Sequence, residues 1–354
     1  MCFGGGNSGA AEAAASQARL DAQEAARQDR IKAGQAKIDQ IFGQFDQPYF
    51  DKYRQDYIAA QTPDLTHQYD VARDKMTAAL AEAVAGKPQR LYNQLTLASG
   101  LPGKRAIVTG GGSGIGRASS EALARAGASV VVSDIDLDAA TAVAEGIAAD
   151  GGVAVPQRCD VAEPDECGAL VAHAIDAFGG LDVLHANAGI ALAFRGDGFA
   201  PQIDPADWDR VIRVNLSGVF HCVHHAVPAM AARGGGSIIT TASSMSTVPL
   251  GGMDAYAASK GGVAMLTKSM APGCGPLGIR INAIGPGYVE TPMNGVILDD
   301  PTLTGLFAAG HADGHLQTPD EIGDLVVFLA SDASRSLNGA LLTCDRGWTS
   351  FKRP

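Results

Sequence analysis

The sequence predicts an α/β fold, a doubly wound parallel sheet with helices on both faces, behind an all-helical N-terminal extension. From residue 104 onward, short apolar runs rich in β-branched residues alternate with helix-forming stretches, which is typical of a parallel sheet. Composition also changes near residue 100, because residues 1–100 hold 12 glutamines and the remaining 254 hold three. We therefore expect a helical extension (1–86), a linker (87–103) and one α/β domain (104–354).

The domain offers seven candidate strands separated by helical stretches, enough for one doubly wound sheet whose ligands bind at the carboxyl ends of its strands. These strands are Arg105–Thr109, Ser129–Asp134, Val153–Arg158, Asp182–Ala186, Gly236–Ala242, Ile279–Ile284 and Ala340–Cys344.

A glycine cluster, Gly110-Gly111-Gly112-Ser113-Gly114-Ile115-Gly116, follows the first strand and opens a helix. Glycines there let the backbone pass close to a pyrophosphate, and the helix presents free N–H groups and a positive dipole end to it. The spacing is T-G-x-x-x-G-x-G, with Gly110, Gly114 and Gly116 as the glycines used. The cluster therefore predicts a nucleotide site.

Polar residues at three further strand ends extend this site. Asp134 closes the second strand 18 residues after Gly116, where a carboxylate accepts hydrogen bonds from ribose hydroxyls and repels a 2′-phosphate. Neither Ser113 nor Ile135 is a basic residue that would bind such a phosphate, so we expect NAD as the cofactor. Asp160-Val161 suits the adenine, and Asn187-Ala188-Gly189 lets the cofactor approach the backbone.

Tyr256 and Lys260 lie four residues apart, so they share one face of a predicted helix. Ionising a free tyrosine at pH 7 costs about 4 kcal/mol, and a neighbouring ammonium lowers that cost by favouring the phenolate. Tyr256 is thus a candidate general acid or base, and Ser243 a candidate donor to the substrate oxygen.

With these motifs in order, the domain resembles the short-chain dehydrogenase/reductase family over residues 104–349, a Rossmann fold. The matching positions are Thr109 to Gly116, Asp134, Asp160, Asn187-Ala188-Gly189, Asn215, Ser243, Tyr256, Lys260 and Pro286-Gly287. The resemblance implies an NAD-dependent oxidoreductase acting on a secondary alcohol or its ketone. It implies that Asn215 holds a water of a proton relay from Lys260, that Lys260 binds the nicotinamide ribose, and that Thr291 bonds the carboxamide.

The catalytic set implied in this way is Asn215, Ser243, Tyr256 and Lys260, with no metal. The implied cofactor-binding residues are Gly110, Ser113, Gly114, Ile115, Gly116, Asp134, Asp160, Val161, Asn187, Gly189, Tyr256, Lys260, Pro286, Gly287, Val289 and Thr291. We expect an apolar substrate pocket formed by Met245, Val248, Pro249, Met253, Tyr288 and the segment after Met293.

The sequence departs from the family pattern at two places that bear on structure. Pro272, with Gly273 and Gly275, is expected to end the helix after Lys260 about a turn early. That helix usually contributes to the subunit interface in the family, so a homo-oligomer is possible but in doubt. Arg346 stands in Cys344-Asp345-Arg346-Gly347 where the family has a flexible glycine.

Composition excludes several other functions. A net charge of −11 argues against nucleic acid as a partner. The six cysteines form no C-x-x-C pair. The sequence shows neither a signal peptide nor an 18-residue apolar run. We therefore expect a cytoplasmic protein without a membrane segment.

The extension suggests an alternative. With its Met1-Cys2-Phe3-Gly4-Gly5 opening and the Tyr57 to Leu80 pattern, it vaguely resembles small Ala/Gln-rich helical proteins among tailed-phage structural components. That likeness implies at most a packing or assembly role. The alternative is therefore an assembly protein carrying a nucleotide-binding but inactive dehydrogenase domain.

Overall fold

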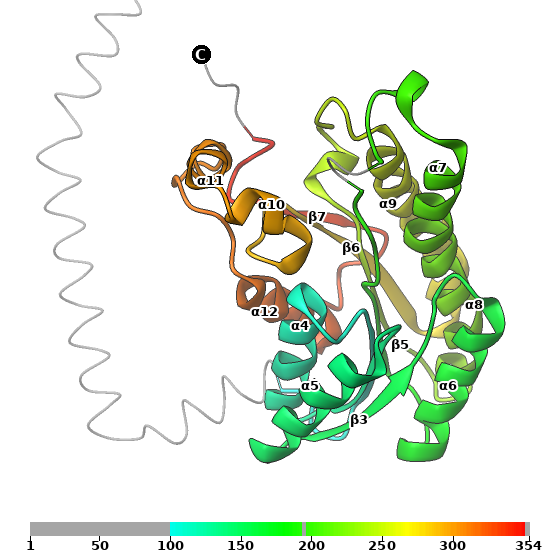
Figure 1. Cartoon of the computed structure of the whole chain (residues 1–354). Coiled ribbons are helices and arrows are strands. Elements are labelled where there is room, and N and C mark those ends of the chain that lie inside the picture. Colours follow the sequence, from blue (N-terminus) through cyan, green and yellow to red (C-terminus); the bar gives the residue numbers. More distant parts are fainter. Residues whose placement is uncertain (1–99, 193–195, 351–354) are drawn as a thin grey trace, which may run out of the picture. The chain divides into compact units, whose positions relative to one another are not determined.

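A computed structural model describes residues 100–192 and 196–350 of the chain, and the predicted helical extension (1–86) lies outside them. The described part contains a seven-stranded sheet of order β3-β2-β1-β4-β5-β6-β7, in which every pairing is parallel (Figure 1). The strands are β1 (Arg105–Thr109), β2 (Ser129–Asp134), β3 (Val153–Arg158), β4 (Val183–Ala186), β5 (Gly236–Thr241), β6 (Ile279–Pro286) and β7 (Leu341–Cys344). All seven expected strands are confirmed, with ends shifted by at most two residues.

Helices of the described part connect the strands. They are α4 (Gly114–Arg125), α5 (Leu137–Ala149), α6 (Pro164–Phe178), α7 (Pro205–Ile212), α8 (Gly218–Ala231), α9 (Asp254–Cys274), α10 (Gly295–Leu298), α11 (Pro301–Ala308) and α12 (Pro319–Ala330). A π-helical turn, η2 (Arg213–Ser217), joins α7 to α8, and a 3₁₀ turn, η3 (Ser244–Ser246), follows β5. The remaining short 3₁₀ turns are η1 (Ala200–Gln202), η4 (Gly275–Leu277), η5 (Pro292–Asn294) and η6 (Asp332–Ser334).

Two apolar cores lie on opposite faces of the sheet, because successive strand residues point to opposite sides. In β1, Ile107 belongs to the core beneath α6, α8 and α9, whereas Ala106 and Val108 belong to the core beneath α4, α5 and α12. Figure 1 shows these two helical layers flanking the strands. The expected doubly wound architecture is therefore observed.

The chain reverses direction across the sheet between β1 and β4. β1 pairs with β2 on one side and with β4 on the other, so the loops after β1 and β4 diverge at their carboxyl ends. Such a switch point is where open parallel sheets bind ligands. The glycine cluster follows β1, and Asn187 follows β4.

Packing of the domain begins three residues before the boundary that we expected. Leu101 is only 1% exposed, and its N–H donates to the Ala126 carbonyl at 2.7 Å. Gly103 N–H donates to the Gly127 carbonyl at 3.2 Å. Leu101 and the backbone of Gly103 therefore contact the domain.

The expectation that Pro272 ends its helix early is wrong. Helix α9 continues to Cys274 with Pro272 inside it, and Ala271 and Cys274 on its inner face are buried. Proline removes one backbone hydrogen bond, that to the carbonyl of Lys268, and Lys268 is exposed to solvent. Packing of the apolar face outweighs this local cost. The early helix end, on which the doubt about a homo-oligomer rested, is therefore not observed.

Arg346 adopts the left-handed backbone conformation that the family's glycine would favour, with φ of 46°. Its guanidinium forms ion pairs with Asp313 and Glu321, and its carbonyl accepts from Ala312 N–H at 2.7 Å. These contacts hold a bulky residue in a conformation that costs an L-residue about 1–2 kcal/mol. Trp348, two residues on, packs its indole directly against Gly310.

Among the described residues, no helix combines the length and apolar character that crossing a membrane requires. That same part of the chain contains no cluster of three or more His, Cys, Asp or Glu side chains suited to a metal ion.

Candidate active site

A cavity of about 1020 Å³ opens at the switch point, over the carboxyl ends of the strands. All sixteen residues expected to bind the cofactor line it, and so does Ser243. Asn215, the remaining expected catalytic residue, is fully buried behind the cavity wall. Residues spread over 182 positions of sequence, from Gly110 to Thr291, are thus brought together.

The glycine loop has no room for side chains. Gly110 has φ of +65°, and a Cβ placed on it would lie 3.0 Å from the Ala188 Cα. A Cβ on Gly116 would collide with the Gly110 carbonyl. The loop is thus tightly folded on the start of α4. That helix has no side-chain cap and no acidic residue in its first turn, so its N–H groups and positive dipole end face the cavity unneutralised.

Asp134 stands at the end of β2 and binds backbone at two points. Its Oδ2 accepts from Gly112 N–H at 2.9 Å, and its Oδ1 accepts from Asp136 N–H at 3.1 Å. The carboxylate therefore faces the cavity from a fixed position beside the glycine loop. Asp160 is held similarly, because its Oδ1 accepts from Ala162 N–H at 2.9 Å.

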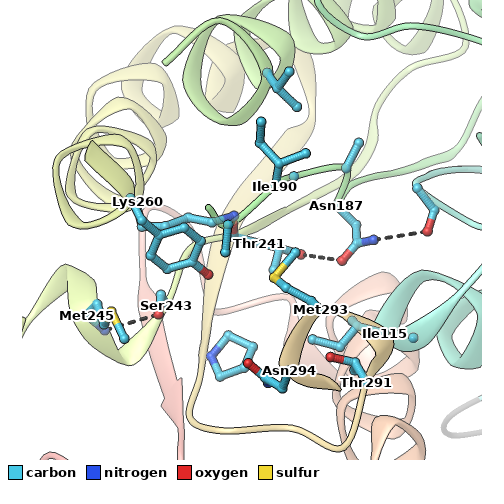
Figure 2. A pocket seen from close by; sticks show the side chains of 18 of the residues that line it. Ile115, Asn187, Ile190, Thr241, Ser243, Met245, Lys260, Thr291, Met293 and Asn294 are labelled. Carbon is cyan, nitrogen blue, oxygen red and sulfur yellow. Dashed lines mark hydrogen bonds between the residues drawn. The ribbon is translucent and has the colours of Figure 1, made fainter. Parts of the chain in front are cut away.

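Asn187 joins the loop after β4 to the glycine loop. Its Nδ2 donates to the Thr109 carbonyl at 3.0 Å, and its Oδ1 accepts from the Thr241 hydroxyl at 3.1 Å. Figure 2 shows Asn187 beside Thr241, which lies on the side of Lys260. The amide thus connects β1, β4 and β5 at the cavity floor.

The segment Pro286–Thr291 forms the opposite wall. Gly287 N–H donates to Gln317 Oε1 at 2.9 Å, and Asn294 Nδ2 donates to the Val289 carbonyl at 2.7 Å. Thr291 is 9% exposed, and its methyl group approaches the position that a Cβ on Gly114 would occupy, at 3.1 Å. This wall therefore comes close to the glycine loop at Thr291 (Figure 2).

Tyr256 and Lys260 lie one turn apart on α9, as expected, with the Lys260 Nζ 5.7 Å from the centre of the Tyr256 ring. Lys260 Nζ donates to the Thr241 carbonyl at 2.7 Å. Burial lowers the pKa of Lys260 to about 8, so the ammonium is still the main form at pH 7.

The pKa of Tyr256 lies above its ordinary value, whereas we expected Lys260 to lower it. Burial of the phenol raises the pKa because it penalises the phenolate, and the hydrogen-bonding Ser243 hydroxyl offsets only part of this effect. The protein groups alone thus keep Tyr256 in its protonated form at neutral pH.

Ser243 is fixed by the turn that follows it. Its Oγ accepts from Met245 N–H at 3.1 Å, and its own N–H donates to the Ser246 hydroxyl at 3.2 Å. That hydroxyl in turn donates to the Lys260 carbonyl at 2.8 Å. Ser246, which the sequence analysis did not single out, therefore ties Ser243 to the helix that carries Lys260.

Asn215 sits in the π-helical turn η2, a feature frequent at functional sites. Its amide accepts from Ile190 N–H at 2.7 Å and donates to the Ile190 carbonyl at 2.9 Å and to the Ser259 hydroxyl at 3.1 Å. A Cβ on Gly189 would lie 3.2 Å from Asn215 Oδ1 and 3.3 Å from Lys260 Nζ. Gly189 thus keeps the space between Asn215 and Lys260 free of a side chain.

The apolar wall differs in part from expectation. Met245, Met253, Tyr288 and Met293 line the cavity as expected. Val248 and Pro249 do not line it and lie exposed in the turn beyond η3. Leu250, Ile297 and Phe307 complete the lining.

Besides Ser246, the sequence analysis missed three further side chains near the site: Asp197, His185 and Thr241. Asp197 accepts hydrogen bonds from the N-terminus of α9, and nothing in its loop sequence signals this role. His185 and Thr241 are hydrogen-bonded inside the sheet. A histidine within the apolar run Val183-Leu184-His185-Ala186 was a signal that could have been followed.

Comparisons with known proteins match the same region. The family model described as "Enoyl-(Acyl carrier protein) reductase" matches residues 110–349. The chain is 39% identical over 247 residues to cyclohexanol dehydrogenase of Acinetobacter sp. (strain SE19), covering 70% of this chain and 95% of that protein. It is 41% identical over 246 residues to cis-4-hydroxycyclohexanecarboxylate dehydrogenase of Sinomonas cyclohexanicum, covering 69% and 96%.

A solved structure agrees with the fold. The chain superposes on a gluconate 5-dehydrogenase from Burkholderia cenocepacia J2315, in complex with NADP and tartrate, with a TM-score of 0.69 and 35% identity. The match covers 73% of this chain and all of that one. The likeness of residues 1–100 to phage structural proteins finds no support in these comparisons.

Proposed function

This chain belongs to the short-chain dehydrogenase/reductase family of oxidoreductases, and we propose that it is an NAD-dependent dehydrogenase of secondary alcohols, interconverting the alcohol and its ketone. The observation that carries the proposal is the meeting of Ser243, Tyr256 and Lys260 in one cavity with the glycine loop. We propose Tyr256 as the general acid or base, with Asn215, Ser243 and Lys260 completing the catalytic set.

The lining suits a nicotinamide dinucleotide. The glycine loop and the uncapped N-terminus of α4 would hold the pyrophosphate, Asp134 the adenosine ribose, and Asp160 with Val161 the adenine. Lys260, Asn187 and Gly189 would hold the nicotinamide ribose side, and Pro286–Thr291 the carboxamide. When bound, the nicotinamide supplies the hydride for reduction or accepts it in oxidation.

Tyr256 handles the proton in our proposal. Its protonated phenol can donate to a substrate carbonyl in reduction, and the phenolate can take the hydroxyl proton in oxidation. Ser243, on the same side of the cavity, donates to the substrate oxygen as negative charge develops on it. The Lys260 ammonium favours the phenolate whenever Tyr256 has given up its proton.

The exchanged proton leaves along Lys260 in our proposal. Asn215 and Gly189 shape the space beside Lys260 Nζ, which is where we place the water of the relay. The Asn215 amide itself is engaged by Ile190 and Ser259. These side-chain contacts also hold the loop after β4 against the π-helical turn.

We propose NAD in preference to NADP because of Asp134. A fixed carboxylate at the end of β2 repels a 2′-phosphate, and the neighbouring Ile135 and Ser113 offer no positive charge to it. The gluconate 5-dehydrogenase that resembles this chain was solved with NADP, and the titration of both cofactors below tests the preference.

For the substrate, we propose an alicyclic alcohol of about the size of cyclohexanol. Two relatives are named for alcohols on a six-membered carbon ring. The thioethers of Met245, Met253 and Met293, with Leu250, Ile297 and Phe307, give an apolar lining that suits such a ring.

The test combines binding with turnover on the full chain. NADH and NADPH are titrated by fluorescence, and oxidation is followed with cyclohexanol, cis-4-hydroxycyclohexanecarboxylate and gluconate. We expect NADH binding, turnover of the ring alcohols, and a loss of at least about a hundredfold in turnover for Tyr256→Phe with NADH affinity retained. Near-normal turnover by Tyr256→Phe would remove Tyr256 from the mechanism. Cofactor binding without turnover on any alcohol would instead favour the inactive assembly protein, for which we see no supporting contact in the described part of the chain.

A further inference from the structure

A histidine lies inside the sheet next to the proposed cofactor site. His185 belongs to β4, which pairs with β1 and β5, and it is fully buried between Val108 and Ile239 of those strands. An apolar residue would fill this position without leaving a polar atom unpaired. In the described part of the chain, His185 Nδ1 has no hydrogen-bond partner, so this histidine costs folding free energy that an apolar residue would not.

The other ring nitrogen of His185 begins a chain of hydrogen bonds. Nε2 lies 2.9 Å from the Thr241 hydroxyl, which donates to Asn187 Oδ1 at 3.1 Å. Since the Thr241 proton points to Asn187, the Thr241 oxygen accepts the proton of His185 Nε2. His185 is therefore the neutral tautomer that carries its proton on Nε2.

The Thr109 carbonyl, which can only accept, sets the direction of the Asn187 amide, and the hydrogen bond from Thr241 reinforces it. With its oxygen satisfied by Thr241, the amide must turn its NH₂ group toward the Thr109 carbonyl, 3.0 Å away. The opposite tautomer would let Thr241 donate to His185 and would favour a flipped amide. The Asn187 oxygen would then face the Thr109 carbonyl, and His185 would bury an unpaired N–H, which folded proteins rarely tolerate.

Asn187 carries the effect into the glycine loop. A Cβ built on Gly116 would lie 2.8 Å from Asn187 Nδ2, and a Cβ built on Gly110 would lie 3.2 Å from it. The amide nitrogen is therefore packed directly against both glycines. Both glycines line the cavity. Thr241 has a second role, since its carbonyl accepts from Lys260 Nζ at 2.7 Å. Figure 2 shows Lys260, Thr241 and Asn187 in this order along the cavity floor.

We propose that His185 is a positioning residue for the cofactor site: by donating from Nε2 to Thr241, it locks the Asn187 amide in the orientation that holds the glycine loop for a nicotinamide dinucleotide. The inference rests on the proposed function. Burial together with the charge of Lys260 lowers the pKa of His185 to about 3, so the ring is neutral in the pH range in which an enzyme works. His185 consequently donates the same hydrogen bond throughout the range in which an enzyme works.

The test measures the Kd for NADH and for NADPH, by fluorescence titration of the full chain, in four single variants. His185→Leu removes the donor. His185→Gln replaces it, because the Gln amide nitrogen is as many bonds from Cβ as Nε2. His185→Asn places its amide nitrogen at the Nδ1 position, one bond too short. Thr241→Val removes the hydroxyl and keeps the carbonyl that binds Lys260.

We expect His185→Leu, His185→Asn and Thr241→Val each to raise the Kd of the preferred cofactor by about tenfold, the effect of losing one or two hydrogen bonds. His185→Gln should stay within about threefold of the native chain. The double variant His185→Leu/Thr241→Val should bind like either single variant, because both break the same chain of hydrogen bonds. The pH profile of kcat should be unchanged in His185→Gln.

A purely structural role for His185 predicts a lower Tm with an unchanged Kd. The proposal is overturned if folded His185→Leu or Thr241→Val binds the cofactor within twofold of the native chain, or if His185→Gln is impaired as much as His185→Asn. If His185→Leu does not fold, Thr241→Val decides alone. Failure of the native chain to bind either cofactor overturns the proposed function as well, whereas native binding with unaffected variants overturns only this inference.

Discussion

The carboxylate of Asp197 accepts the backbone N–H of Tyr256 at 2.9 Å, across 59 residues of sequence. The same carboxylate accepts from Ala255 N–H at 3.1 Å. Asp254, the first residue of α9, in turn accepts from Ala200 N–H in the segment of Asp197, at 2.9 Å. Asp197 is 9% exposed. It thus caps the first turn of α9 from outside that helix, in the turn that presents the proposed acid–base tyrosine.

Loss of this cap should lower both stability and turnover. We expect Asp197→Ala to reduce the free energy of unfolding by about 1 kcal/mol, as other N-cap losses do, and to lower kcat more than the affinity for NADH. The matched control is Asp204→Ala, which removes the Asp204 cap that accepts from Ala206 N–H at 2.8 Å in α7. A similar loss of stability in the control, with kcat intact, would show that the position of Tyr256 matters. Equal kcat values for the two variants would contradict this reading.

Cofactor preference should depend on the charge of Asp134. Replacing it by Ala should weaken NADH binding by about 1–3 kcal/mol, the range for a hydrogen bond to a charged group, and should improve NADPH binding relative to NADH. Asp134→Asn keeps the side-chain size and removes the charge, so its NADPH affinity isolates the repulsion of the 2′-phosphate. Fluorescence titration with both cofactors gives the ratio of the Kd for NADPH to the Kd for NADH. A native chain that prefers NADPH would show that the NAD assignment is wrong.

Acid should destabilise the protein through His185. Its pKa is about 3 in the folded chain, below the ordinary 6.5, because burial disfavours the charged ring. Below pH 6.5, His185 binds a proton in the unfolded chain but stays neutral in the folded chain. The free energy of unfolding therefore falls as pH falls toward about 3, by up to about 1.4 kcal/mol per pH unit. Between pH 7 and pH 5, His185→Gln should lose about 2 kcal/mol less than the native chain in urea unfolding. The exposed His224, replaced by Gln, is the control, and an equal pH dependence in all three proteins would refute the expectation.

The backbone conformation of Arg346 gives a prediction about stability. Both Arg346→Ala and Arg346→Gly remove the ion pairs with Asp313 and Glu321, but only glycine adopts φ of 46° without strain. We therefore expect the Gly variant to be more stable than the Ala variant by about 1 kcal/mol, or about 2–4 °C in Tm. Calorimetry of the two variants measures the difference. An Ala variant as stable as the Gly variant would argue against the left-handed conformation.

The α/β domain should fold without the N-terminal region. A shortened chain beginning at Gly100 retains Leu101, whose side chain is buried in the core beneath α4, α5 and α12. We expect it to melt cooperatively and to bind NADH within about threefold of the full chain, since few contacts cross a domain boundary. A chain beginning at Gly103 lacks Leu101 and should melt at a lower temperature, because a buried leucine contributes about 2 kcal/mol or more. Aggregation of the Gly100 chain would sink the claim of an independent domain.

The features that the sequence predicted correctly are those that depend on residues close together in the chain. The β-branched run of β1, the glycines after it, and the four-residue spacing of Tyr256 and Lys260 each specify local structure through steric limits or helix periodicity. Because every strand of the sheet is parallel, the carboxyl ends of the strands share one edge, so the order of motifs along the chain also placed them in one cavity.

The features that the sequence did not predict depend on contacts between segments far apart in the chain. Pro272 is a helix breaker locally, yet Ala271 and Cys274 are buried, and this packing carries α9 past it. Burial alone moved the pKa of Tyr256 upward against the expected effect of Lys260. The fold, the glycine loop and the pairing of Tyr256 with Lys260 follow from the sequence alone, because propensity and spacing are local, whereas Asn215 entered the proposed catalytic set through the family resemblance. The tertiary structure alone brings Asp197 to Tyr256 and His185 to Thr241, because a hydrogen bond needs two atoms within about 3 Å and no local pattern states which distant segments will meet.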